Sequence, residues 1–530
     1  MIVEATSRHG GSAARTQERS AVTGDHAPAA PGPGGPTPGD VVRWSDEQVS
    51  AMGLRIDDVP FVSVGGGIGS FVTVDYLRIA GALGVDDIKV VSNLAHPWQT
   101  YEYLTRVSQI PRSERIRSDS ASRPDNLWGF PSYAVSESIR TRSLRPALQV
   151  LVEPTLTGYY TPKLGSVLEG MEREAARIRY REMLVTGVAT TVRHREGGGY
   201  FVLVAEGPAG APNRVLRCRD VHLALGYAGL AFQPELRQLR TESGDHVSLV
   251  NAYEDHEHLY ERLRQGPATV VVRGGGIVAS RILERLVKER RQHGSQVRVV
   301  HVLRTYVADS HGPHPWARRR GKDGFAYQGF NYPKSVWGGQ LRAEMRRADD
   351  DKRRRLYDQI GGTTTASRPS WRRQLRTARQ EGWYDARPGV INQITRLADG
   401  RLHLRLAGTE STSEVVADAV IDCTGLNADV RGHRVLADLL DHGGARRNVL
   451  DRMDVGPSFE LRGAESGMGR VYVTGAAALG GYFPGVDTFL GLQLAAQDVV
   501  SDIAARGHCR TLGPARSIRQ WVRWMRNAPI

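Results

Sequence analysis

Cysteine is scarce in this chain. Cys218, Cys423 and Cys509 are the only cysteines in 530 residues, and no two of them stand at a C-x-x-C spacing. That spacing is typical of redox-active disulfides and of zinc sites. Its absence excludes both kinds of site, and we expect no metal. Few, scattered cysteines are also typical of a reducing compartment, and we expect a cytoplasmic protein.

Long apolar runs and lysines are also few. No stretch approaches the length of a membrane span, and the N-terminus lacks a charged-then-apolar signal pattern, so we expect no membrane partner. Only Lys89, Lys163, Lys288, Lys322, Lys334 and Lys352 are lysines, so arginine supplies most of the net charge of +14. No DNA or RNA recognition motif accompanies this charge, so we expect no nucleic-acid partner. A basic surface favours an acidic partner, such as a carrier protein.

The overall composition is that of an ordinary globular protein. Hydrophobic residues make up 40% of the chain and charged residues 24%, as in globular proteins, and the length allows two or three domains. Residues 1–45 are rich in Ala, Gly and Pro, so we predict that this segment is disordered. Order is expected to begin near Val59.

Two glycine-rich turns carry most of the information. The first follows the apolar run that starts at Phe61 and contains Gly65-Gly-Gly67-Ile-Gly-Ser70. The second follows the run that starts at Val270 and contains Gly274-Gly-Gly276-Ile-Val-Ala279-Ser280. Each fits the strand–turn–helix motif that lets a backbone approach a pyrophosphate at a helix N-terminus. Two such turns in one chain predict two dinucleotides.

The two halves repeat one plan, which strengthens this interpretation. Each has a glycine turn, a long irregular insertion, a short meander and an apolar strand that ends in glycine. The predicted elements are, in the first half, strand 60–64, helix 68–83, strand 88–92, helix 166–183, strands 183–192 and 200–205 and a strand ending at Gly226; in the second half, strand 268–272, helix 277–293, strand 297–303, strands 389–396 and 401–406 and a strand ending at Gly425.

A last unit contains a strand that ends at Thr474-Gly475 and a helix from about Thr488 to Ala505. The tail beyond it places Ile518, Trp521, Val522 and Met525 on one helical face. We expect this terminal helix to dock on the core through that face.

In these features the chain resembles the two-dinucleotide-binding flavoproteins, and most nearly the NADPH-dependent flavin monooxygenases and N-hydroxylases. Besides the paired turns and Thr474-Gly475, the strand that begins at Asp220 and ends in Leu223-Ala-Leu-Gly-Tyr227 looks like an N-hydroxylase signature, with Leu225 in place of threonine. In that family the signature follows the NADPH turn, whereas here it precedes it. The Baeyer–Villiger monooxygenase signature is not found.

The resemblance implies an α/β fold with two Rossmann-like, three-layer domains, the NADPH domain inserted into a split FAD domain. The implied segments are a disordered tail (1–45), the first half of the FAD-binding domain (56–245) with a substrate insertion (93–165), an NAD(P)H-binding domain (246–410) with an insertion (305–385), the second half of the FAD-binding domain (411–510) and a C-terminal helical tail (511–530).

For FAD, the implied contacts are Gly65, Gly67, Ile68, Gly69, Ser70, Ser92, Gly226, Gly425, Gly475, Asp487 and Thr488. Flavoproteins of this kind usually carry an acidic residue at the end of the second strand to hold the ribose, where this chain has Ser92-Asn93. A hydroxyl or amide bonds a ribose more weakly than a carboxylate does.

For NADPH, the implied contacts are Gly274, Gly276, Ala279, Ser280 and Arg304. Arg304 follows the strand 297–303, where an arginine would meet the 2′-phosphate, and Arg281 is a second candidate.

The two insertions contain many aromatic and polar residues, which suits a substrate pocket. The candidates are Trp98, Gln99, Trp128, Tyr133, Asn331 and Lys334. No catalytic side chain is indicated, because the cofactors carry the chemistry.

The resemblance implies that NADPH reduces FAD and that O2 then oxygenates a small-molecule or carrier-bound substrate; N-hydroxylation of an amine is one such reaction. Two alternatives stay open: a flavin-dependent oxidoreductase without oxygen insertion, and a degenerate nucleotide-binding regulatory protein.

Overall fold

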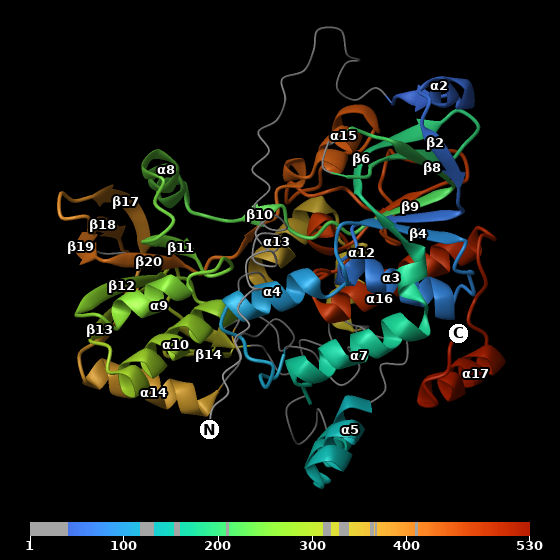
Figure 1. Cartoon of the computed structure of the whole chain (residues 1–530). Helices are drawn as coiled ribbons and strands as arrows, with labels where there is room; N and C mark the ends of the chain where they lie inside the picture. Colours follow the sequence, from blue (N-terminus) through green and yellow to red (C-terminus); the bar gives the residue numbers. More distant parts are fainter. Residues whose placement is uncertain are drawn as a thin grey trace, which may run out of the picture.

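The structure is a computed structural model, and it describes residues 41–116, 132–152, 160–207, 211–310, 320–327, 339–360, 365, 368–408 and 412–530. Two α/β units lie side by side (Figure 1). Each is built on a five-stranded parallel sheet, which confirms the predicted fold class.

The first unit contains the sheet β22–β9–β3–β4–β5, all parallel. Its strands are β3 (Phe61–Val64), β4 (Ile88–Ser92), β5 (Leu184–Thr186), β9 (Asp220–Leu223) and β22 (Val471–Val473). Helices α3 (Ile68–Ile79) and α16 (Phe489–Ala505) pack against each other beside this sheet. The last strand of the sheet therefore comes from the end of the chain.

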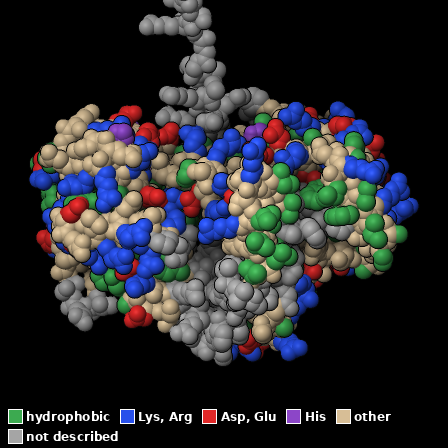
Figure 2. All heavy atoms as spheres, turned by 90° about the horizontal axis from the view of Figure 1, so that it is seen from below, with side chains coloured by type: hydrophobic (Ala, Val, Ile, Leu, Met, Phe, Trp, Pro, Cys, Tyr) green, Lys and Arg blue, Asp and Glu red, His purple; other side chains and the backbone are tan. Residues whose placement is uncertain are grey.

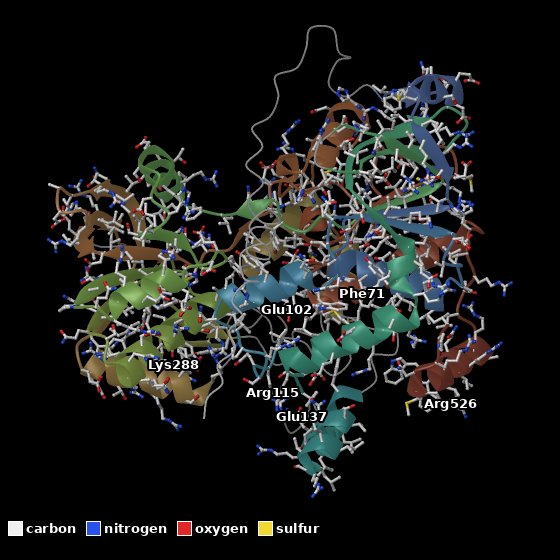
Figure 3. The ribbon with its side chains drawn as sticks, in the orientation of Figure 1. Phe71, Glu102, Arg115, Glu137, Lys288 and Arg526 are labelled. Atoms are coloured by element: carbon white, nitrogen blue, oxygen red, sulfur yellow. The ribbon has the colours of Figure 1, made fainter. Side chains whose placement is uncertain are left out.

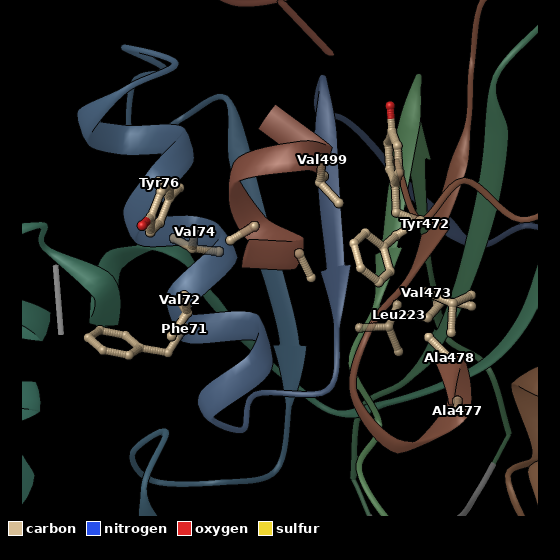
Figure 4. Packing of buried hydrophobic residues seen from close by; sticks show 14 of the residues in the cluster. Phe71, Val72, Val74, Tyr76, Leu223, Tyr472, Val473, Ala477, Ala478 and Val499 are labelled. Carbon is tan, nitrogen blue, oxygen red and sulfur yellow. The ribbon is translucent and has the colours of Figure 1, made fainter. Parts of the chain in front are cut away.

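Buried side chains from these elements form one apolar core (Figure 4). Val74 and Tyr76 of α3 lie near Val499 of α16, and the Tyr76 hydroxyl accepts a hydrogen bond of 3.1 Å from the Gln497 amide. On the other side, Phe71 packs edge-on against a tyrosine ring, with centroids 5.6 Å apart. This packing fixes α3, and with it the glycine turn that precedes it.

A second sheet, β1–β6–β7–β8–β2, flanks the first unit. Its strands are β1 (Arg43–Trp44), β2 (Arg55–Asp58), β6 (Val188–Arg195), β7 (Tyr200–Ala205) and β8 (Arg214–Cys218). Ordered structure thus begins before Val59, which corrects the expected start.

Contacts with distant parts of the chain hold this segment, and so its own sequence pattern does not reveal it: Val49 is buried in a cluster with Phe201 and Val215. Ser45 and Gln48 form a capping box at the start of α2 (Asp46–Ala51), and Arg195 and Arg217 both pair with Asp46.

The second unit contains the parallel sheet β11–β20–β12–β13–β16. Its strands are β11 (Leu249–Asn251), β12 (Ala268–Arg273), β13 (Val297–Leu303), β16 (Tyr384–Pro388) and β20 (Ala419–Asp422). The meander β17 (Val390–Arg396), β18 (Leu402–Ala407) and β19 (Thr412–Ala417) adjoins it, and helix α10 (Ile277–His293) follows β12.

Strand β20 lies inside this second sheet, between β11 and β12, although the sequence pattern assigned residues after 410 to the other unit. The reason is pairing: Val420 and Ile421 lie opposite Val271 and Val272 of β12, which an apolar strand pattern cannot specify. The chain passes from the first unit to the second through β10 (Gly229–Leu230) and returns through β21 (Leu426–Asn427). These two strands pair with each other in antiparallel fashion. The two units are therefore joined by a short two-stranded connection.

Both insertions, expected to be irregular, contain helices. They are α4 (Gln99–Val107), α5 (Ser132–Thr141) and α6 (Arg145–Val152), then α12 (Gln340–Arg347), α13 (Asp350–Ile360) and α14 (Pro369–Gln380). These helices are only 8 to 12 residues long, so each shows about two to three turns of the helical period. The remaining elements are α7 (Leu164–Arg177), α8 (Pro234–Ser243), α9 (Glu257–Leu263), α15 (Arg434–His442), α17 (Pro514–Met525), β14 (Arg320–Lys322), β15 (Phe325–Tyr327) and short 3-10 turns at Tyr180–Met183, Val430–Gly432 and Gly475–Ala478.

The terminal helix α17 does not dock as expected. Ile518 and Met525 are 65% and 61% exposed, and Trp521 is 37% exposed. The helix is held instead by polar contacts: the Arg516 guanidinium donates to the Ile79 and Ala80 carbonyls at the end of α3. The predicted docking face is therefore wrong: Ile518, Trp521 and Met525 of that face are exposed.

Candidate functional site

The first glycine turn is pressed against neighbouring strands on one side and open on the other. Gly65 has φ +90°, and a Cβ there would lie 2.5 Å from the Ala224 carbonyl oxygen. A Cβ on Gly66 would lie 2.3 Å from the Ser92 Oγ, whereas one on Gly67 would meet nothing within 4 Å. Gly65 and Gly66 are needed for packing, and Gly67 leaves open space for a ligand.

That open space lies at the N-terminus of α3. Gly67 is the N-cap residue, provides no side-chain cap, and is followed by no acidic residue in the first turn. Uncapped N–H groups and the positive end of the helix dipole favour an anion here. The site can therefore hold a pyrophosphate, and Ile68 and Gly69 lie in its first turn.

Gly69 and Ser70 face inward instead. A Cβ on Gly69 would lie 3.2 Å from the Ala224 Cβ and 3.3 Å from the Leu492 Cδ2, so Gly69 allows α3 and α16 to approach. Ser70 is fully buried. Ser70 therefore packs beneath the turn, inside the protein, and does not face the open space.

Ser70 is one end of a buried polar chain that sequence analysis missed. Hydrogen bonds join Ser70 Oγ to Ser63 Oγ (2.7 Å), Ser63 Oγ to His222 Nδ1 (2.9 Å) and His222 Nε2 to Thr474 Oγ1 (2.8 Å). Burial lowers the pKa of His222 to about 3, so the imidazole is neutral. The available signal was one polar residue, Ser63 or His222, flanked by apolar residues on both sides in each strand.

Ser92, the predicted ribose contact, ends β4 beneath the turn and is 8% exposed. Its hydroxyl accepts a 3.0 Å hydrogen bond from the Leu94 N–H. Asn93 is exposed. Gly66 packs directly on Ser92, so the space for a longer acidic side chain is restricted at this point.

The predicted contacts from the two ends of the chain meet here. Tyr227, next to Gly226, donates a 2.8 Å hydrogen bond to Asp487. Thr488 caps α16 by accepting from the Gly491 N–H at 3.1 Å. Gly475 has φ +74°, and a Cβ there would lie 3.9 Å from the Leu492 Cδ2 of the same helix. The start of α16 therefore lies beside the carboxyl ends of the first sheet.

Asp220, the acidic residue of the signature, lies elsewhere. It begins β9, at the edge opposite the glycine turn, and forms an ion pair of 2.9 Å with Arg506. The Arg470 N–H also donates to it at 3.0 Å. Its role here is to hold the amino ends of β9 and β22 together.

The second glycine turn is built in a similar way. Gly274 has φ +123°, and a Cβ there would lie 2.9 Å from the Cys423 carbonyl oxygen. Gly276 is the N-cap of α10 and provides no side-chain cap. The His301 Nε2 lies 2.6 Å from the Gly274 carbonyl oxygen and its Nδ1 lies 2.9 Å from the Tyr384 hydroxyl. Burial lowers the pKa of His301 to about 4, so both turns rest on a buried neutral histidine.

An arginine that the sequence pattern did not single out directly precedes this turn. Arg273 ends β12, and its Nη1 lies 3.1 Å from both carboxylate oxygens of Asp422 and 3.0 Å from the Thr424 Oγ1. Burial raises the pKa of Asp422, which Arg273 opposes. Gly425, which follows with φ +118°, leaves open space. Here Gly425 lies in the second unit, not at the FAD turn.

The two arginine candidates for the 2′-phosphate differ. Arg304 directly follows β13 and is exposed. Arg281 is only 6% exposed and pairs with Glu114 and with Glu284, the latter at 2.6 Å. Burial lowers the pKa of Arg281 to about 10. Arg304 is therefore the accessible cation of the two.

Ala279 and Ser280 are fully buried on α10. The Ser280 Oγ donates to the Ile277 carbonyl at 2.7 Å and accepts from Thr365 and Arg368 at 2.9 and 2.7 Å. These residues therefore hold α10 in place rather than face the open side of the turn.

Of the substrate candidates, Trp128, Asn331 and Lys334 lie outside the described residues. Trp98 stacks on His96 with centroids 4.7 Å apart, and Gln99 accepts a 2.8 Å hydrogen bond from the Ala95 N–H. Both lie at the start of α4, which contacts the first residue of α16 through Tyr101 and Phe489 (5.1 Å).

Tyr133 is buried on α5, a helix that lies apart from α4 (Figure 1). Among the described residues, no group of His, Cys, Asp and Glu could hold a metal ion. None of the described helices is long and apolar enough to cross a membrane.

Comparison with known proteins gives a structural likeness without a sequence likeness. No protein-family model and no curated protein matches the chain. Among solved structures, the ornithine hydroxylase of Pseudomonas aeruginosa matches with a TM-score of 0.60 at 14% identity, over 85% of this chain and 100% of that one.

The Kutzneria sp. 744 ornithine N-hydroxylase, solved with reduced FAD, NADP+ and L-ornithine, matches with a TM-score of 0.60 at 13% identity, over 85% of this chain and 100% of that one. The cadaverine monooxygenase of Erwinia amylovora, solved with FAD, matches with the same score at 13% identity, over 86% of this chain and 96% of that one. The chain therefore has the fold of these three hydroxylases.

Proposed function

We propose that the chain is an FAD-dependent, NADPH-using monooxygenase that oxygenates the amine of a small molecule. The observation that carries the proposal is the pair of glycine turns, each opening an uncapped helix N-terminus at the carboxyl end of a parallel sheet. Its support is the likeness in fold to hydroxylases solved with FAD and with NADP+. This fold alone does not fix activity, so the site must carry it.

In this proposal the first unit holds FAD. Gly67 and the N-terminus of α3 receive the pyrophosphate, and Ser92 lies nearest the ribose. The start of α16, with Asp487 and Thr488, faces the far end of the cofactor, where a helix N-terminus stabilises negative charge. When bound, the flavin supplies hydride acceptance and O2 activation.

The second unit holds NADPH in this proposal. Gly276 and the N-terminus of α10 receive the pyrophosphate, and Arg304 receives the 2′-phosphate. Arg273, fixed by Asp422, adds a cation at the mouth of the turn. We place the boundaries between the units at the paired strands β10 and β21, so that the FAD unit comprises 56–228 and 428–510.

The substrate is proposed to lie near Trp98 and Gln99 at the start of α4, a helix that contacts α16 through Tyr101 and Phe489. The relatives in fold act on ornithine and cadaverine, so amines of this kind are the first candidates. A substrate delivered on an acidic carrier protein is the second candidate, and the net charge of +14 favours it.

The proposal is tested by aerobic incubation with FAD, NADPH and ornithine, lysine or cadaverine. NADPH oxidation and hydroxylated amine are measured together. Matched amounts of the two support a monooxygenase. NADPH oxidation that yields only hydrogen peroxide with every amine and carrier-bound amine would instead support a flavin oxidoreductase without oxygen insertion. No flavin uptake and no NADPH oxidation would support a regulatory protein.

A further inference from the structure

A cleft of about 610 Å³ separates α10 of the second unit from α4 and α7 of the first. Figure 3 marks its two sides with Glu102 on α4 and Lys288 on α10. Its apolar lining comes from Ile110, Leu164, Leu168 and Val287. This volume lies in the usual range for small-molecule sites.

The charged lining of the cleft is predominantly cationic. Six cations, Arg106, Arg112, Arg281, Arg285, Lys288 and Arg291, face two carboxylates, Glu102 and Glu284. Seen from below, Lys and Arg side chains are spread widely over the molecule (Figure 2), but this set converges on one hollow between the units.

Carboxylates already balance part of this charge. Arg285 pairs with Glu257 and with Glu289, and Arg112 pairs with Glu102 at 3.3 Å. Lys288 and Arg291, one turn apart on α10, form no ion pair within the described part of the chain. Two cations at the mouth of the cleft are therefore available to an anion.

The cleft is separate from both glycine turns. Its α10 residues run from Arg281 to Gln292, away from the helix N-terminus at Gly276, and none of its lining residues belongs to either turn. Direct contacts between the units flank it: Arg285 Nη1 donates to Gln109 Oε1 at 3.1 Å, and Ser108 Oγ donates to the Ala252 carbonyl at 3.3 Å.

We propose that this cleft is a binding site for a small molecule that carries two or more phosphate groups, distinct from the two dinucleotides. Guanidinium groups match phosphate oxygens in pairs, and the apolar lining can accept the organic part of the ligand. Because both units line the cleft, the bound ligand braces them against each other.

The test uses the full chain with saturating FAD and NADP+, so that other nucleotide sites are filled. Tripolyphosphate is the probe, and isothermal titration calorimetry is the measurement. We expect saturable binding of one probe per chain. Arg291→Ala weakens it about tenfold, as expected for the loss of one charge-assisted contact at a partly exposed site. The double variant Lys288→Glu with Arg291→Glu removes detectable binding.

Arg376→Glu on α14 is the matched control. Arg376 is exposed and lies two residues from Gln374, which lines the cleft, so it points to the opposite side of the helix. It changes the net charge as each cleft reversal does, and we expect binding to stay within about twofold of the native chain. Circular dichroism confirms that each variant is folded.

Three results would overturn the proposal. They are the absence of saturable binding to the native chain, a loss in Arg376→Glu equal to that in Arg291→Ala, and binding that is seen without NADP+ but disappears when NADP+ is added. The last result would assign these cations to the dinucleotide instead.

Discussion

Gly67→Ala separates the role of the first turn in binding from its role in folding. Gly67 has φ −77°, which alanine adopts freely, and its Cβ would meet nothing within 4 Å. Alanine is a poorer N-cap than glycine, so we expect the free energy of unfolding without FAD to fall by no more than about 1 kcal/mol. The new methyl group occupies the open space above α3, where the pyrophosphate is proposed to lie.

The expected loss in FAD affinity is much larger. A hydrogen bond to a charged phosphate contributes about 1.5–3 kcal/mol, so losing one of them raises the Kd for FAD about 10- to 100-fold. Fluorescence titration with FAD measures the Kd, and urea unfolding without FAD measures stability.

The matched control is Gly66→Ala, whose Cβ would lie 2.3 Å from the Ser92 Oγ. We expect it to reduce stability as well as affinity, because the side chain collides with β4. An unchanged FAD affinity in a folded Gly67→Ala protein would show that the pyrophosphate does not lie at this turn.

Three further predictions concern the rest of the site. Arg304→Ala should raise the KM for NADPH about 10- to 100-fold and leave that for NADH nearly unchanged, in steady-state assays; equal loss with both cofactors would make Arg304 structural. Gly274→Ala should weaken NADPH binding in calorimetry while FAD stays bound. Alanine at φ +123°, with its Cβ 2.9 Å from the Cys423 carbonyl oxygen, strains the second turn only. Simultaneous loss of FAD would show that the units do not fold independently. Burial lowers the pKa of His301 to about 4, from an unfolded value of about 6.5, so between these pH values the unfolded chain binds a proton that the folded chain does not. The free energy of unfolding therefore falls as pH drops from about 6.5 towards 4, by up to about 1.4 kcal/mol per pH unit for this group. Urea unfolding at several pH values should show a shallower fall in His301→Gln, and an unchanged slope would contradict the neutral buried imidazole.

Much of the site's framework could be predicted from the sequence, because its signals are local. Gly65 and Gly274 need positive φ and close approach to a neighbouring strand, and both demands leave glycine in the sequence. The return of the chain to the first sheet was implied by the resemblance of Thr474-Gly475 to a flavin contact that follows the second turn.

The rest depends on contacts between distant segments. Strand β20 reads as one more apolar strand, and only its pairing with β12 places it in the second sheet. His222 and His301 lie under the turns because neighbouring strands bring them there, and an isolated polar residue in a strand does not reveal such a partner. Arg281 and Arg304 look alike in sequence, and burial against Glu114 and Glu284 distinguishes them.

The most direct test of the proposed function is the origin of the oxygen in the product. The chain is incubated with FAD, NADPH and each candidate amine under isotopically labelled O2, and the products are analysed by mass spectrometry. The account predicts a hydroxylated amine that carries one labelled oxygen atom, formed only when NADPH is present. The account would be contradicted if NADPH were consumed while all amines, including carrier-bound ones, were recovered unlabelled and unmodified.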